Sequence, residues 1–153
     1  RGIKEFDFTQ KHYVDKNCVL DDRKLKKGDL LINSSGVGPA GRVTLFDIEG
    51  DFVVDSHITI LRFDRNKALP EFVLRSLANL GFKNIEAMAM GQSGQIELSI
   101  STIQNIKIPI PPVSNQQKIV SEIEKIEQQI ELLEQELSEI PSKKVEVLHK
   151  HFN

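Results

Sequence analysis

The feature that most constrains the fold is a heptad repeat between residues 114 and 140. Apolar residues recur there at alternating steps of four and three, at Ile119, Ile123, Ile126, Ile130, Leu133, Leu137 and Ile140. A narrow stripe that keeps period 3.5 is typical of a helix paired with another long helix, because an unpaired surface stripe drifts at period 3.6. We therefore predict a helix of about 39 Å over some 26 residues, with a partner helix along its seam. The alternative is a terminal helix packed on a core.

Punctuating residues predict where this helix begins and ends. Pro111–Pro112 blocks an earlier start, and Ser114 with Gln117 matches a capping box. Pro141 predicts a kink or a break. An apolar stripe then resumes in the basic tail, residues 142–153.

Charge along the seam bears on the choice of partner. Residues 121–140 hold one lysine and seven glutamates, which gives this segment a net charge of −6. Since the net charge of the whole chain is −2, the rest of the chain carries +4. With Ile123, Ile130 and Leu137 at a positions, glutamates flank the seam and disfavour pairing of identical copies. We expect a more basic partner helix or a different offset.

Residues 1–112 differ in kind, with short apolar runs separated by turn residues. We predict a single α+β domain with a largely antiparallel or mixed sheet, followed by the helical domain 113–153. The predicted elements are strands at 30–32, 42–48, 52–54 and 58–63, a hairpin through Gly50, a helix from Pro70 to a cap at Gly81, and a turn capped by Ser101 with Gln104.

Composition narrows the class of protein. No apolar run approaches the roughly 20 residues that span a bilayer, so we expect no membrane association. Cys18 is the single cysteine, which excludes a disulfide framework within the chain and favours the cytoplasm.

The stretch NSSGVGPAGRV at 33–43 comes close to a phosphate-binding loop. Gly36 and Gly41 have the required spacing, but Arg42 and Val43 stand where a lysine and a hydroxyl residue are needed. Pro39 also removes one N–H from the cradle. A nucleotide site is therefore not expected.

Catalytic and metal-binding patterns are weak. Asp55, Ser56 and His57 are consecutive, and neighbours in an extended chain point to opposite faces, so they do not predict a triad. The four histidines show no metal-ligand spacing. We expect a chain that is not an enzyme and binds no metal or cofactor.

Three segments together carry a family resemblance: KLKKGDLLINSSGVGPAGRVTLF (24–46), the SHITILRFD strand with the PEFVLRSLAN helix (56–79), and IKIPIPPVSNQQKIVSEIEKI (106–126). The last is the most specific. The whole chain resembles half of the specificity subunit of a Type I restriction-modification enzyme. That resemblance implies a DNA target recognition domain followed by a spacer helix.

In a complete subunit of that family, two such units occur in tandem and their spacer helices pack antiparallel. Each domain reads half of an interrupted double-stranded DNA sequence. The spacer docks methyltransferase subunits that bind S-adenosylmethionine and methylate adenine, and restriction subunits add ATP-driven translocation and cleavage. Since this chain carries one unit, the resemblance implies a fragment or a half-subunit that pairs with a second spacer helix.

Base reading needs directional donors and acceptors in loops that approach DNA closely. The strongest candidate is the GQSGQ stretch, and the glycine run at 33–43 supplies a backbone-rich loop for phosphate. The predicted DNA-binding residues are Gln92, Ser93, Gln95, Arg42, Ser34, Ser35, Lys11, His12, Tyr13, Lys83 and Asn84. The plainer interpretations are a solvated surface loop and a tight turn of the sheet.

Two other functions fit the same residues. The chain is either a DNA-recognition module, or a coiled-coil interaction adaptor with at most weak DNA binding, or a stand-alone transcriptional regulator. Salt dependence of DNA binding separates the first from the second, because phosphate contacts weaken with salt and an apolar seam does not.

Overall fold

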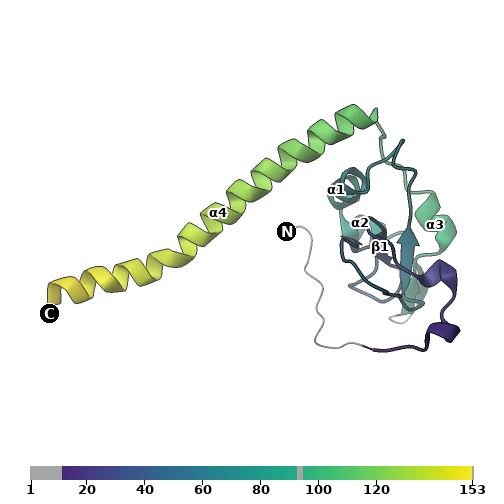
Figure 1. Cartoon of the computed structure of the whole chain (residues 1–153), viewed down its shortest axis with the longest axis horizontal. Coiled ribbons are helices and arrows are strands. Elements are labelled where there is room, and N and C mark those ends of the chain that lie inside the picture. The colour runs from purple at the N-terminus through teal and green to yellow at the C-terminus, as the bar shows by residue number, and fades with distance from the viewer. Residues whose placement is uncertain (1–11, 93–94, 153) are drawn as a thin grey trace. The chain divides into compact units, whose positions relative to one another are not determined.

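A three-stranded antiparallel sheet lies at the centre of the body. The central strand β1 (Leu30–Asn33) pairs on one side with β2 (Val43–Leu45) and on the other with β3 (Ile58–Leu61). The structure is a computed structural model and describes residues 12–92 and 95–152 (Figure 1). The chain divides into two units, residues 1–116 and 117–153. The sheet and its helices confirm the predicted α+β class.

Helix α1 (Pro70–Leu80) packs against β2 and encloses the core. It begins at a proline suited to a first helical turn and ends at Gly81, whose φ of 88° supports the predicted cap. The core lies between the sheet and the helices of the body, and its buried members are Leu30, Ile32, Ala40, Leu45, Ala68, Val73, Leu74, Leu77, Ile85, Leu98 and Ile103. The predicted helix at 70–81 is confirmed.

Shorter elements complete the body. Two 3-10 helices, η1 (Lys16–Cys18) and η2 (Asp21–Arg23), precede the sheet. After α1 come α2 (Phe82–Glu86), the two-stranded hairpin of β4 (Met90–Gln92) and β5 (Gln95–Glu97), and α3 (Ile100–Gln104).

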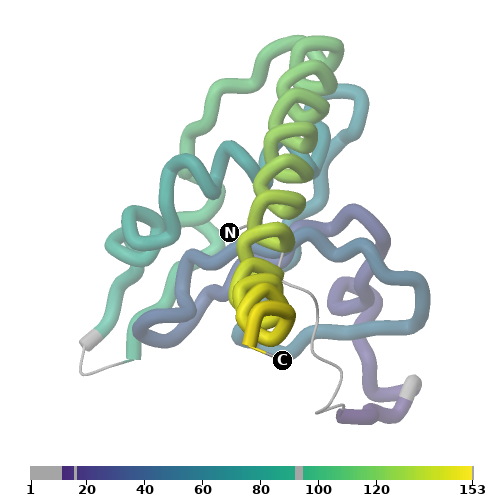
Figure 2. Tube along the Cα trace, turned by 90° about the vertical axis from the view of Figure 1, so that its left-hand side faces the viewer, coloured from purple at the N-terminus to yellow at the C-terminus, as the bar shows by residue number. Residues whose placement is uncertain are grey.

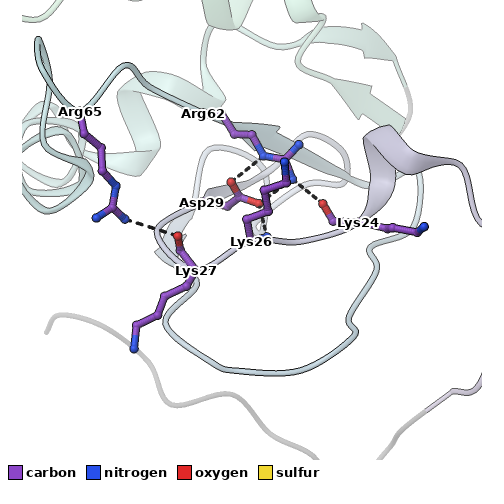
Figure 3. Close-up of polar contacts among 6 residues, drawn as sticks. All are labelled: Lys24, Lys26, Lys27, Asp29, Arg62 and Arg65. Carbon is purple, nitrogen blue, oxygen red and sulfur yellow. Dashed lines mark hydrogen bonds and ion pairs between the residues drawn. The ribbon is translucent and has the colours of Figure 1, made fainter.

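An ion pair between the buried carboxylate of Asp29 and the exposed side chain of Arg62 fixes the turn that enters β1. Asp29 is 2% exposed and accepts from Arg62 through both carboxylate oxygens, at 2.7 and 2.8 Å (Figure 3). The same carboxylate accepts the backbone N–H of Lys26 at 2.7 Å, and Arg62 also donates to the carbonyl of Lys24. The Asp29 carboxylate raises the pKa of the Arg62 guanidinium. The lysine-rich turn is therefore held by a carboxylate with well-satisfied hydrogen bonds.

Two predicted local structures are wrong. No hairpin forms through Gly50, because the backbone at 52–53 pairs instead with residues 24–25: Leu25 N–H donates to the Phe52 carbonyl, and Val53 bridges Lys24. The cap of α3 is Ser99 rather than Ser101, since the Ser99 hydroxyl accepts from the N–H of Thr102 at 3.0 Å.

Helix α4 (Val113–Phe152) is longer than predicted. It begins one residue before Ser114, so that serine lies within the first turn and the predicted capping box is wrong. It continues through Pro141, so of the two predicted outcomes, a kink or a break, the break does not occur (Figure 1). An ion pair spans this proline, with 2.8 Å between Lys143 Nζ and Glu139 Oε2. Such i,i+4 pairs support the helical turn that lacks one backbone N–H.

Candidate nucleic-acid interface

The glycine-rich loop between β1 and β2 is closed at its base by two backbone hydrogen bonds. Gly41 N–H donates to the carbonyl of Asn33, and Asn33 N–H donates to the carbonyl of Arg42. This closure holds residues 34–41 as a loop that projects from the end of the sheet.

The glycine at 41 is required where this loop meets α2. Its φ is 82°, and a Cβ there would lie 2.8 Å from the Phe82 carbonyl oxygen and 2.9 Å from the Glu86 nitrogen. Real side chains do not tolerate such distances. The glycine spacing that resembles a phosphate-binding loop therefore serves, at this position, the packing of backbone on backbone.

Glu86 ties the loop to α2. Its carboxylate accepts from the backbone N–H of Gly38 and from Lys83 Nζ at 2.9 Å. The Lys83 ammonium, followed by the Gly38 N–H, lowers the pKa of Glu86. An ionised carboxylate thus positions the glycine loop beside Lys83.

The β4–β5 hairpin lies along the other side of the loop (Figure 2). Gly36 N–H donates to the Ile96 carbonyl at 3.0 Å, and Leu98 N–H donates to the Ser34 carbonyl at 2.7 Å. Ser35 and Glu97 form an isolated antiparallel bridge. The glycine loop and strand β5, some sixty residues apart in sequence, therefore form one continuous surface.

The turn at 55–57, which directly precedes β3, supports the glycine loop through hydrogen bonds. The backbone N–H and the hydroxyl of Ser34 both donate to the His57 carbonyl, at 2.8 and 2.9 Å. Ser35 Oγ lies 2.6 Å from His57 Nδ1. Asp55 accepts from the backbone N–H of His57 rather than from its ring, so this contact does not make the orienting arm of a triad.

Cationic side chains gather on the α2 side of the loop. The Arg42 guanidinium and Lys83 Nζ each lie 5.2 Å from the centre of the Phe82 ring, and Arg42 Nε donates to the Gly38 carbonyl at 3.0 Å. Arg42 and Lys83 are both exposed. Nearby, Asn84 Nδ2 donates to the Leu80 carbonyl at the end of α1. Two fixed, exposed cations can meet phosphate here.

The structure brings most of the predicted DNA-binding residues together. The loop, α2 and the hairpin hold Ser34, Ser35, Arg42, Lys83, Asn84 and Gln95, with the backbone of Gln92. Gln95 is exposed, whereas Ser34 is 5% exposed and its hydroxyl bonds His57, so its side chain supports the loop.

The N-terminal candidates are described only in part. His12 and Tyr13 are exposed in the segment before η1, and Lys11 and Ser93 lie outside the described residues. Sequence reasoning also missed His57 as a neighbour of the loop. The only signal for it is the register that pairs Asn33 with Ile58, which local sequence does not carry.

The seam of α4 is open to solvent along most of its length. Six of the predicted helix-pairing residues, Ile119, Ile126, Ile130, Leu133, Leu137 and Ile140, are 39–67% exposed, and Ile123 is half-buried. An apolar stripe of this length is a typical contact surface for a second helix.

The start of α4 is anchored to the body by a buried glutamine. Gln116 is 0% exposed. Its side chain accepts from the Leu69 N–H at 2.8 Å and donates to the carbonyls of Lys67 and Pro111, at 2.8 and 2.7 Å. The segment 106–126, which carries the most specific part of the resemblance, therefore contains the residue that joins α4 to the loop before α1.

Among residues 12–92 and 95–152, no group of three or more histidine, cysteine or acidic side chains is placed to hold a metal ion. Within that same part of the chain, no helix is long and apolar enough to cross a membrane.

Comparison with known proteins points in one direction. The model of the Type I restriction modification DNA specificity domain matches residues 11–142. A Haemophilus influenzae protein named as a type I restriction enzyme specificity subunit is 33% identical over 97 residues, which are 63% of this chain and 23% of that protein. The MjaX specificity subunit of Methanocaldococcus jannaschii, also named as part of a type I restriction enzyme, is 28% identical over 122 residues, 75% of this chain and 28% of that protein. The matches thus span about a quarter of these relatives.

Proposed function

This chain belongs to the family of Type I restriction-modification DNA specificity domains, and we propose that it reads one half of a bipartite double-stranded DNA target. The observation that carries the proposal is the convergence of three separate segments, the glycine loop, α2 and the β4–β5 hairpin, on one polar surface of the body.

The chemistry of this surface divides into two roles. Gln95 stands beside the hairpin tip, and a glutamine can bond adenine through both donor and acceptor. Arg42 and Lys83 are exposed cations held against Phe82 on the α2 side of the loop, away from the hairpin, so we assign them to phosphate. Sequence reading would then belong to the hairpin, and orientation on the duplex to the loop and α2.

Helix α4 supplies the second part of the proposal. Its exposed seam would pair with a second spacer helix, from a tandem half or another copy, and would help to dock a DNA adenine methyltransferase subunit. S-adenosylmethionine, and ATP for a restriction subunit, would bind on those partners. The specificity chain itself would carry no catalytic step.

The exposed seam also favours a second candidate function. A coiled-coil adaptor would use the same apolar stripe, and its body would bind DNA weakly or not at all. The two functions differ in salt response, since each phosphate contact adds a slope of about −0.9 to the plot of log affinity against log salt.

A binding selection tests the proposal. The chain is incubated with random duplex DNA at moderate salt, with and without the methyltransferase subunit, and bound DNA is sequenced. One short motif supports a half-target reader, and two motifs at fixed spacing support a paired reader. No enrichment in either condition would leave the adaptor as the better account.

A further inference from the structure

We propose that Ser35 and His57 form a phosphate contact at the foot of the glycine loop, in which the imidazole donates from Nε2 to a DNA phosphate oxygen. The inference rests on the proposed function and adds a residue pair to that surface. His57 was not among the residues predicted from the sequence.

The ring of His57 is held in place from one side. Ser35 Oγ is 2.6 Å from His57 Nδ1, and the backbone carbonyl of His57 accepts two hydrogen bonds from Ser34. Asp55 Oδ1 accepts the His57 backbone N–H at 2.9 Å. These four contacts fix both the backbone and the ring, so little conformational freedom is lost when a ligand binds.

The other ring nitrogen is available to a ligand. His57 is an exposed residue, and none of the hydrogen bonds between described residues involves Nε2. Where the Ser35 hydroxyl donates to Nδ1, the ring carries its proton on Nε2, and an imidazolium donates from both nitrogens. The contact with Ser35 therefore fixes the ring orientation and leaves Nε2 for a ligand.

We assign the ligand of His57 Nε2 to a DNA phosphate rather than to the edge of a base. The pair lies at the foot of the loop, where Ser35 bridges Glu97, while Gln95 lies farther along β5 toward the hairpin tip. Side-chain donors held in a fixed position commonly contact phosphate oxygens. It would position the duplex, and the hairpin would read it.

Charged groups lie on several elements near His57. Asp55 belongs to the same turn, Glu97 lies across the Ser35 bridge, and the Arg23 guanidinium donates to the carbonyls of Val54 and Ile58. As imidazoles as a class change charge between about pH 5 and 8, a phosphate contact strengthens on acidification.

The test measures affinity for target and random duplexes near pH 6 and near pH 8, in complex with the methyltransferase subunit if the chain alone does not bind. The variants are His57→Ala, His57→Gln and Ser35→Ala, with His149→Ala, in the exposed tail of α4, as the matched control. We expect wild type to gain about three- to tenfold in affinity at the lower pH, for both duplexes. His57→Ala and His57→Gln should lose that gain and reduce the salt slope at the lower pH by about 0.9. Ser35→Ala should reduce the gain, and His149→Ala should keep it.

Three other results are possible, and each would contradict a specific claim. An unchanged pH gain and salt slope in both His57 variants would overturn the phosphate contact and leave the proposed function intact. A loss of affinity confined to the target duplex would also overturn the phosphate contact, because that result would indicate a contact with a base. Absence of DNA binding by wild type in both conditions would overturn the proposed function and this inference together. His57→Gln keeps the backbone carbonyl that Ser34 uses, so it separates loss of the ring from loss of the turn.

Discussion

The side-chain oxygen of Gln116 accepts a hydrogen bond of 2.8 Å from the backbone N–H of Leu69. Leu69 is the residue before α1, and Gln116 lies in the first turns of α4. The same side chain also donates to two backbone carbonyls. One buried amide therefore connects the segment that carries α4 to the segment that starts α1.

Replacement of Gln116 should be costly. Gln116→Ala leaves the partly buried N–H of Leu69 and two carbonyls without their partner, and we expect the free energy of unfolding to fall by about 2 kcal/mol or more. Urea denaturation of the full chain measures the change. Gln117→Ala is the matched control, because Gln117 is exposed, and its effect should stay within about 0.5 kcal/mol. Equal effects of the two variants would contradict the anchoring role.

The glycine loop gives a second matched pair. Gly38 and Gly41 both have positive φ, 95° and 82°, but a Cβ at Gly38 meets nothing within 4 Å, whereas one at Gly41 collides with α2. Gly38→Ala should lower the free energy of unfolding by about 1 kcal/mol through backbone strain alone. Gly41→Ala should lower it by a further 1 kcal/mol or more through the clash. Thermal or urea unfolding compares them, and similar losses would show that α2 yields to the loop.

Acid should loosen the loop through Glu86. Its pKa is lowered in the folded chain, so the stabilising effect is complete above its ordinary value of 4.5 and is lost as the pH falls through the lower folded value. Glu86→Gln should therefore destabilise the chain near neutral pH, and the deficit should shrink in acid. Unfolding free energies across this range measure the effect. Glu146→Gln, in the exposed tail of α4, serves as control, and a deficit for Glu86→Gln that stays constant with pH would contradict the account.

Local sequence signals correctly predicted the elements that are bounded by strong start or stop residues or that consist of a clear apolar run. Strand β1 followed from its apolar run, and α1 followed from Pro70 and Gly81. The hairpin through Gly50 failed because Phe52 packs edge-on against Phe46, with ring centres 5.6 Å apart, while its backbone pairs with Leu25. Local turn chemistry does not report such distant pairing.

The same limit applies to the candidate site. Polar side chains near glycine identified the hairpin and the glycine loop separately, by their chemistry. Their association depends on the bridge between Ser35 and Glu97, and the place of His57 depends on the register of β1 with β3. Both depend on contacts between residues far apart in the chain, which local sequence does not encode. Helix α4 shows the opposite case, since a strong local signal at Pro141 was overridden within a long helix.

Arg42 should contribute affinity without sequence preference. Arg42→Ala removes one exposed cation beside Phe82, so we expect target and random duplexes to lose affinity alike and the salt slope to fall by about 0.9. Titrations at several salt concentrations measure both. Arg65→Ala is the control, because Arg65 is exposed near the turn at the opposite end of β1, beside the Lys27 carbonyl (Figure 3). A loss confined to target DNA would place Arg42 among the base readers instead.

The most direct test of the account repeats the DNA selection with wild type and Gln95→Ala side by side, each with the methyltransferase subunit present. We predict that the wild type enriches a defined motif and that Gln95→Ala loses preference at one base position, by about 1–3 kcal/mol, while the others persist. The same motif at unchanged strength for both chains would contradict the claim that the hairpin beside the glycine loop reads DNA sequence.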